Sequence, residues 1–302
     1  MAEPHSFRFG AYEALSVPAG TFRLDGGAMF GVVPKVLWSR ERAADEKNRI
    51  ELATRCLLLR GHGRTILVDG GIGDKDDARF REIYGVERRT SVADVLRDVL
   101  KLDPASVTDV VATHLHFDHA GGLTRRGASG VELAFPNANV YVQASHLRWA
   151  AAPPPKERAS FIPDNVLPIA GSARLRALDG DETVAPGVGV SVKRGHTTGF
   201  QVIEVAGDGR EKLVFLSDLV PTASHLKLPY VMGYDNLPVV TLEEKRELFE
   251  RAARHGDTLF FEHDPRVVAC RLRKADDAVS YAPVDALLER GSAGGQGEVG
   301  SP

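Results

Sequence analysis

Residues 110–122, VVATHLHFDHAGG, place three histidines and one aspartate within six positions, directly after a run rich in β-branched residues. The run predicts a strand, and His114, His116, Asp118 and His119 follow it. Side chains in a tight turn after a strand can converge on one point, whereas those within a strand alternate between its two faces. The stretch therefore predicts a strand that delivers several ligand-type side chains to one place.

Imidazole and carboxylate groups at this spacing are typical metal ligands. Neutral imidazole suits zinc, copper, iron and nickel, and a carboxylate beside it adds negative charge. The four side chains supply ligands for two neighbouring ions. The alternative, a helix N-terminus that is rich in histidine by chance, is disfavoured because histidine rarely occurs at such density.

The rest of the chain alternates short strands with helices. Residues 50–61 and 64–71 predict two strands joined by a hairpin turn, and residues 131–143 predict a strand pair around a Pro-Asn turn. Residues 153–164, PPPKERASFIPD, predict a loop or lid. Helices are expected at 91–102, 144–152 and 241–256.

The last of these helices carries two further signals. Thr241 and Glu244 form the pattern of a capping box at its start. Leu248, Phe249 and Ala252 are spaced to line one apolar face. We therefore expect a helix that begins at residue 241 and packs on a sheet.

The second half of the chain repeats the order of elements in the first. We expect an α/β protein with one domain over residues 1–290, built from two pseudo-symmetric halves at about 1–160 and 165–290. Residues 291–302 are rich in glycine and serine and predict a disordered tail.

The charge balance argues against macromolecular and membrane partners. Lysine and arginine total 38 against 41 aspartates and glutamates, so no bulk attraction to nucleic acid or an anionic membrane is expected. No stretch reaches the roughly 18 apolar residues of a membrane span, and the start does not read as a signal peptide. Cys56 and Cys270 lie in apolar runs that predict buried, reduced thiols. A cytoplasmic protein that acts on a small molecule is expected.

The stretch THLHFDHAGG resembles the HxHxDH signature of the metallo-β-lactamase superfamily. Three more stretches resemble its remaining ligand positions in the same order: KRGHTTGF contains His196, VFLSDLV contains Asp218 and FFEHDP contains His263. The resemblance implies a four-layer αββα sandwich that binds one or two metal ions at its edge.

The resemblance also implies how the ligands divide. His114, His116 and His196 would hold one metal, Asp118, His119 and His263 the second, and Asp218 would bridge both. Zinc is the first expectation, with manganese, iron or cobalt as substitutes. Asp118 and Asp218 are the expected catalytic carboxylates. The remaining histidines His5, His62, His146 and His255 are expected to be surface or structural residues.

Asp69 in ILVDGG resembles another landmark of the superfamily, a strand-end aspartate below the metals. A carboxylate there would accept the free ring N–H of a ligand histidine and fix its tautomer. The alternative is an ordinary turn aspartate before two glycines.

Three further stretches resemble the branch that contains acyl-homoserine-lactone lactonases and methyl-parathion-hydrolase-like enzymes. They are GGAMFGVVPKVLW, FPNANVYVQASHLRW and DLVPTASHLKLP. A metal-dependent hydrolase is implied, in which hydroxide on a dinuclear centre opens an ester-type bond, foremost a lactone. Phosphotriester or thioester hydrolysis, or a mononuclear-iron persulfide dioxygenase, are the alternatives. The lactonases place a tyrosine three residues after the bridging aspartate, where this chain has Pro221. Candidates to replace its hydroxyl are His225, Tyr230 and Tyr234.

The segment 29–38, MFGVVPKVLW, has three possible roles. Phe30, with Met29, Val32, Val33 and Trp38, is expected to form an apolar wall near the metals. Core packing explains these residues equally well. The segment also suits the contact of a homodimer.

Overall fold

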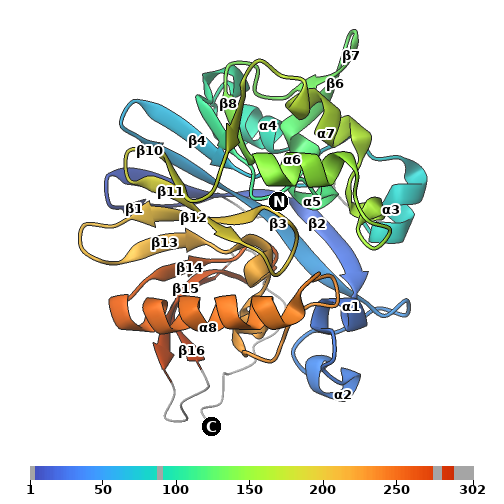
Figure 1. Cartoon of the computed structure of the whole chain (residues 1–302), viewed down its shortest axis with the longest axis vertical. Helices are drawn as coiled ribbons and strands as arrows, with labels where there is room; N and C mark the ends of the chain where they lie inside the picture. Colours follow the sequence, from blue (N-terminus) through green and yellow to red (C-terminus); the bar gives the residue numbers. More distant parts are fainter. Residues whose placement is uncertain (1–3, 87–90, 275–280, 289–302) are drawn as a thin grey trace.

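The computed structural model describes residues 4–86, 91–274 and 281–288, and two seven-stranded sheets form its centre (Figure 1). The expected tail at 291–302 lies outside the described residues. The first sheet contains, in spatial order, β1 (His5–Phe9), β2 (Tyr12–Asp25), β3 (Arg49–Gly61), β4 (Arg64–Val68), β5 (Asp109–Val111), β8 (Asn139–Gln143) and β9 (Leu175–Leu178).

The second sheet follows the first along the chain and is mostly antiparallel. It contains, in spatial order, β10 (Glu182–Ala185), β11 (Val188–Lys193), β12 (Phe200–Ala206), β13 (Lys212–Phe215), β14 (Thr258–Phe260), β15 (Val267–Lys274) and β16 (Tyr281–Leu288). The chain passes from one sheet to the other between β9 and β10, later than the expected boundary at 160–165. The reason is that β9 still pairs with β8 in the first sheet.

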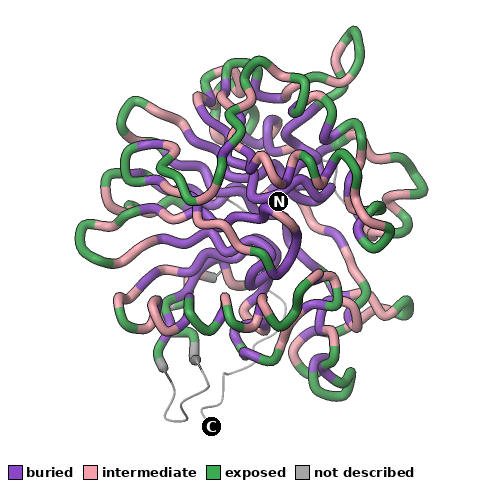
Figure 2. Tube along the Cα trace, in the orientation of Figure 1, coloured by how far each residue is buried: buried purple, intermediate pink, exposed green. Residues whose placement is uncertain are grey.

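The two sheets pack face to face over an apolar core. Leu57 and Ile66 from the first sheet share a buried cluster with Val190, Ile203 and Phe215 from the second. Figure 2 shows buried chain concentrated along both sheets, with exposed chain in the peripheral loops and helix surfaces. Burial of large aliphatic and aromatic side chains from both inner faces stabilises this pairing.

Helices cover the outer faces of both sheets. The α-helices of the described residues are α1 (Gly26–Phe30), α2 (Lys35–Trp38), α3 (Ala78–Tyr84), α4 (Val92–Asp94), α5 (Phe117–Ala120), α6 (Ala144–Ala151), α7 (Pro163–Ala170) and α8 (Pro238–His255). Leu96, just after α4, and Val166 of α7 pack against the first sheet, whereas Phe249 of α8 packs against the second. The layers are therefore α, β, β and α, as expected (Figure 1).

Two local expectations are wrong. Residues 131–143 do not form a strand pair, because β7 (Gly130–Leu133) pairs with β6 (Thr124–Gly127) while β8 joins the first sheet. Helix α8 begins three residues before Thr241, with a proline in its first turn, so the capping box does not form. Within the described residues, no helix combines the length and apolar character needed to cross a membrane.

Candidate metal centre

The predicted ligands follow strands that end at the same edge of the sandwich. Strands β4 and β5 are parallel, as are β13 and β14, so the carboxyl ends of each pair lie together. Asp69 follows β4 and His114 follows β5, while Asp218 follows β13 and His263 follows β14. Loops at such strand ends are where open sheets commonly bind ligands.

Two glycine pairs hold the loops of the first sheet together. The Gly70 N–H donates to His119 O at 2.7 Å, and the Gly122 N–H donates to Gly71 O at 2.9 Å. A Cβ on Gly122 would lie 2.1 Å from Gly70 O, so the backbones approach too closely for any side chain. The DGG and AGG stretches therefore place Asp69 beside the histidine turn.

A first group of possible ligands consists of His114, His116, His196 and Asp218. One ligand atom from each lies within 4.8 Å of the others. His114 Nε2 is 3.0 Å from His116 Nδ1, and His196 Nε2 is 3.0 Å from Asp218 Oδ2. All four residues are buried.

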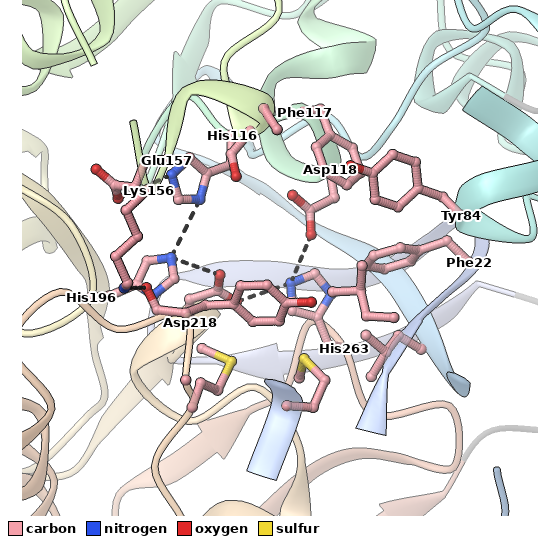
Figure 3. A pocket seen from close by; sticks show the side chains of 18 residues that line it. Phe22, Tyr84, His116, Phe117, Asp118, Lys156, Glu157, His196, Asp218 and His263 are labelled. Atoms are coloured by element: carbon pink, nitrogen blue, oxygen red, sulfur yellow. Dashed lines mark hydrogen bonds and ion pairs between the residues drawn. The ribbon is translucent and has the colours of Figure 1, made fainter. Parts of the chain in front are cut away.

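A second group consists of Asp118, His119 and His263. Nε2 of His119 and Nε2 of His263 are 3.2 Å apart, and Asp118 Oδ2 lies 3.7 Å from the former. Asp218 joins the groups, since its Oδ1 is 3.0 Å from His263 Nε2. Figure 3 shows His116, His196, Asp118, Asp218 and His263 converging on one region.

The outward ring nitrogens indicate which nitrogen carries the proton. His196 Nδ1 lies 2.9 Å from Asp235 Oδ1, and His263 Nδ1 lies 2.8 Å from the Ala53 carbonyl. Because these oxygens can only accept, each outer nitrogen donates its N–H and the inner Nε2 presents a lone pair. His119 Nδ1 faces Asp69 Oδ2 and Glu262 Oε2, both at 3.1 Å, with the same consequence.

Lone pairs that face each other at these distances repel unless a cation lies between them. The donor set, five imidazoles and two carboxylates, is the set that zinc and similar ions prefer. Asp218 Oδ1 is buried and has no hydrogen bond to any described residue, which leaves it available to a cation. The residues therefore fit a metal centre.

The electrostatics agree with this interpretation. Burial lowers the pKa of His196, but Asp218 and Asp235 more than compensate and raise it to about 10. Burial raises the pKa of Asp218, but His196, His119 and His263 bring it well below its usual value. The buried carboxylates thus hold positive charge at this place, and metal ions would supply that charge in place of ring protons.

A cavity of about 230 Å³ opens directly above the two groups. Its polar floor includes His116, Asp118, His196, Asp218 and His263. Its other lining residues are Phe22, Leu24, Met29, Leu52, Tyr84, Phe117, Lys156, Glu157, Ala159, Ser160, Met232, Gly233 and Tyr234. The cavity therefore combines a charged floor with a largely apolar wall.

The predicted contact residues separate into two kinds. Tyr234 lines the cavity, whereas Phe30, His225 and Tyr230 pack behind it. The His225 Nε2–H donates to the Met29 carbonyl at 2.8 Å, and its ring stacks on Phe30 at 4.9 Å. Both side chains are buried in the packing of the segment 26–38, so they do not face the cavity.

The predicted apolar wall is also mostly absent from the cavity. Met29 lines it, but Trp38 and Val33 are part of the core and Val32 is 93% exposed. The apolar lining instead includes Phe22 and Leu24 of β2, Leu52 of β3 and Met232, together with Met29.

The other histidines lie outside the metal groups. His146 is fully buried, where its Nε2 accepts the Leu115 N–H at 2.8 Å and its Nδ1–H donates to the Thr198 carbonyl. It therefore supports the histidine turn from behind. His62 occupies the β3–β4 turn, His5 lies in β1 and His255 ends α8.

Sequence reasoning missed several residues around the site. Glu157, Asp235 and Glu262 face ligand histidines, and Tyr84 lines the cavity. Glu262 directly precedes His263 just after the apolar strand β14 (Thr258–Phe260), which is an observable signal. The others lie in segments without a recognisable motif, so only the fold brings them to the site.

This fold and this order of ligands define the metallo-hydrolase class that the HxHxDH motif indicated. A family model described as the metallo-beta-lactamase superfamily matches residues 49–269. The chain belongs to the metallo-beta-lactamase superfamily. The resemblance and the fold expected from the sequence are thus confirmed.

Particular relatives narrow the comparison. The chain is 25% identical over 226 residues to the N-acyl homoserine lactonase AiiA of Bacillus thuringiensis subsp. kurstaki, an alignment that covers 71% of this chain and 82% of AiiA. A probable metal-dependent hydrolase from Staphylococcus aureus has a TM-score of 0.83 and 28% identity, covering 92% of this chain and 98% of that one.

A further solved structure is AidC, a dizinc quorum-quenching lactonase in complex with a hexanoyl-homoserine product. Its TM-score is 0.75 at 18% identity, covering 94% of this chain and 97% of that one. At this level of identity the similarity shows the fold alone.

Proposed function

We propose that this protein is a lactonase that binds two zinc ions and opens the ring of N-acyl homoserine lactones. The observation that carries the proposal is the pair of ligand groups sharing Asp218 at the floor of an apolar cavity. The similarity to AiiA supports the same substrate class.

Each group has a separate task in this proposal. Bound divalent ions would activate water and polarise the carbonyl oxygen of the lactone. His114, His116 and His196 would hold the first ion, Asp118, His119 and His263 the second, and Asp218 both. Asp118 faces the cavity, where its carboxylate can take a proton from the water and pass it to the leaving alkoxide.

The apolar wall suits the acyl chain of such a substrate. The cavity lining includes the apolar side chains of Phe22, Leu24, Met29, Leu52 and Met232. Burial of each methylene of an acyl chain against such a wall contributes about 0.8 kcal/mol. We therefore expect kcat/KM to rise with chain length until the wall is covered.

Tyr234 is our candidate for the missing hydroxyl donor. Pro221 occupies the position where related lactonases have tyrosine. Its backbone carbonyl accepts the backbone N–H of His263 at 3.2 Å. Burial raises the pKa of Tyr234, so the phenol stays protonated at neutral pH and can donate to a substrate carbonyl. Burial also raises the pKa of Tyr84, which lines the same cavity.

The test combines metal analysis with a substrate panel. Metal content would be measured by mass spectrometry on protein purified without added metal. Hydrolysis of short- and long-chain lactones, thioesters and a phosphotriester would be followed with a pH indicator. About two zinc ions per chain with fastest turnover of long-chain lactones supports the proposal.

Other results would contradict part of the proposed function. Faster hydrolysis of the thioester or phosphotriester would contradict the lactone specificity but keep the metal centre. A single iron with oxygen consumption and no ester hydrolysis would favour persulfide oxidation instead. The cytoplasmic location and the homodimer contact through residues 29–38 stay predictions.

A further inference from the structure

Glu157 lies at the mouth of the cavity, in the segment between α6 and α7 that we call the lid (residues 153–162). Its side chain is buried although the lid runs over the surface. One carboxylate oxygen, Oε2, accepts the indole N–H of Trp149 from α6. The other oxygen, Oε1, has no hydrogen bond to any described residue.

The unbonded oxygen faces a candidate metal ligand. Glu157 Oε1 lies 3.5 Å from His116 Nε2, which is also buried and without a hydrogen bond to any described residue. The other nitrogen of this ring, Nδ1, is turned toward His114 Nε2 and the first ligand group. Figure 3 shows Glu157 beside His116 at the edge of the cavity.

His116 differs in this respect from the other ligand histidines. Each of the other four has an oxygen within 3.1 Å of its outward nitrogen, from Thr113, Asp69, Asp235 or Ala53. Three of these partners belong to the first sheet or to the turns that end its strands. The outward nitrogen of His116 instead faces a carboxylate that the lid supplies.

The neighbouring lid residue reaches the same ligand group from another side. Lys156 Nζ donates to the carbonyls of Tyr234 and Asp235 at 2.7 and 2.8 Å. Asp235 in turn accepts the ring N–H of His196. Two consecutive lid residues are thus linked to two of the three histidines in the first group.

We propose that Glu157 is a positioning residue that couples the lid to the first metal. When the lid is closed, its carboxylate accepts the Nε2–H of His116, which keeps the Nδ1 lone pair free for the metal. Because coupling free energies are reciprocal, metal binding then holds the lid closed. The inference rests on the metal centre of the proposed function but not on its substrate.

The experiment measures metal affinity and lid protection without using turnover. Zinc affinity would be measured by chelator competition, and cobalt absorption spectra would report the ligand geometry. Hydrogen exchange of the lid would be compared with and without zinc. The variants are Glu157→Gln, Glu157→Asp and, as a matched control, Trp149→Phe, which removes the other hydrogen bond of the carboxylate.

Glu157→Gln should weaken binding of one of the two metals about 10- to 100-fold, the loss typical of such partners. It should also reduce the protection of the lid by zinc, because an amide has one oxygen in place of two, so its NH2 group must face either the Trp149 N–H or the His116 Nε2–H. Glu157→Asp, which keeps the charge, should recover part of the affinity, and Trp149→Phe should bind both metals nearly as the unaltered protein does.

Three outcomes would overturn the inference. Unchanged metal affinity in Glu157→Gln would show that the carboxylate only packs the lid. Equal losses of zinc affinity in Glu157→Gln and Trp149→Phe would also show that the carboxylate only packs the lid. If zinc does not change the hydrogen-exchange rates of the lid in the unaltered protein, the lid and the metal are not coupled. Protein that binds no metal at all would instead contradict the proposed metal centre itself.

Discussion

At the scale of single residues, hydrogen-bond partners decide what each histidine can do. His196 has Asp235 on its outward nitrogen and therefore presents a lone pair to the ligand group. His225 has the Met29 carbonyl on one nitrogen and the Thr222 hydroxyl on the other, so both are used within the core. Two histidines in loops near one cavity thus have different roles.

The two tyrosines near the cavity offer a matched test of the proposed substrate contact. Tyr234→Phe removes the hydroxyl of a residue that lines the cavity, whereas Tyr230→Phe removes the hydroxyl of a residue that packs on the neighbouring apolar cluster and does not line the cavity. Loss of a hydrogen bond to the developing oxyanion should lower kcat for lactones about 10- to 100-fold in Tyr234→Phe.

Metal content and steady-state kinetics of both variants check this expectation. Zinc content should stay the same in each, and Tyr230→Phe should keep its kcat. Equal losses in the two variants would mean that the effect is structural.

His225 predicts a dependence of stability on pH. Burial lowers its pKa to about 3, against 6.5 for the ordinary side chain, although the Met29 carbonyl opposes this. Below pH 6.5 the unfolded chain therefore binds a proton that the folded protein does not. The free energy of unfolding falls as the pH drops from about 6.5 toward 3.

His225→Gln removes this contribution. The substitution should destabilise the protein at pH 7, because the ring packs on Phe30. At pH 5 the destabilisation should be smaller by about 2 kcal/mol. Urea unfolding at both pH values measures it, and an equal loss at pH 5 and pH 7 would contradict the neutral, buried imidazole.

At the scale of elements, close backbone contacts position the site. Gly121 lies just after α5, and a Cβ there would be 1.9 Å from the Ile72 carbonyl oxygen. Gly189 in β11 has room, since a Cβ would meet its nearest atom, the Glu182 carbonyl oxygen, at 3.4 Å. The two glycines serve as test and control.

Gly121→Ala should destabilise the fold by at least about 1–3 kcal/mol, because the loops after β4 and β5 must separate. Gly189→Ala should change stability by less than about 0.5 kcal/mol. Denaturant unfolding of both variants gives the comparison. Gly121→Ala that unfolds like the unaltered protein would show that these loops tolerate separation.

In helix α8, one side chain has a role that the sequence pattern did not predict. Glu244 was expected to cap this helix, but its carboxylate accepts the backbone N–H groups of Arg194 at 2.7 Å and Gly195 at 3.2 Å. The side chain therefore holds the loop that carries His196. A capping pattern and a loop contact need the same residue type, so the sequence alone does not distinguish them.

At the scale of the whole molecule, metal binding should stabilise the fold. The two ligand groups join residues from both sheets, so cations bound there hold the sheets together at one edge. A ligand that binds only the folded state stabilises it by about 2.7 kcal/mol at a concentration 100 times its Kd.

Removal of metal with a chelator should therefore lower Tm, and added zinc should restore it. Asp218→Ala loses the carboxylate shared by both groups, so its Tm should respond much less to zinc. Scanning calorimetry of the two proteins with and without chelator measures the difference. If chelator does not change the Tm of the metal-loaded, unaltered protein, a metal centre that joins the sheets is contradicted.

The sequence by itself determined the resemblance to the superfamily, because that resemblance rests on short local motifs. The layered fold and the full set of candidate ligands were what the resemblance implied. Each short motif follows an apolar strand, and a motif such as HxHxDH identifies the candidate ligand positions from their spacing alone. The helix at 144–152 and the hairpin at 61–63 were equally local and were confirmed.

Only the tertiary structure decided which partners surround those ligands. Asp235 is 39 residues from His196, and Glu157 is 41 residues from His116. Tyr84, Tyr234 and Leu52 meet at one cavity from three separate segments. Hydrogen bonds and cavity walls form between groups that are near in space, and no local sequence pattern indicates that these particular segments come together.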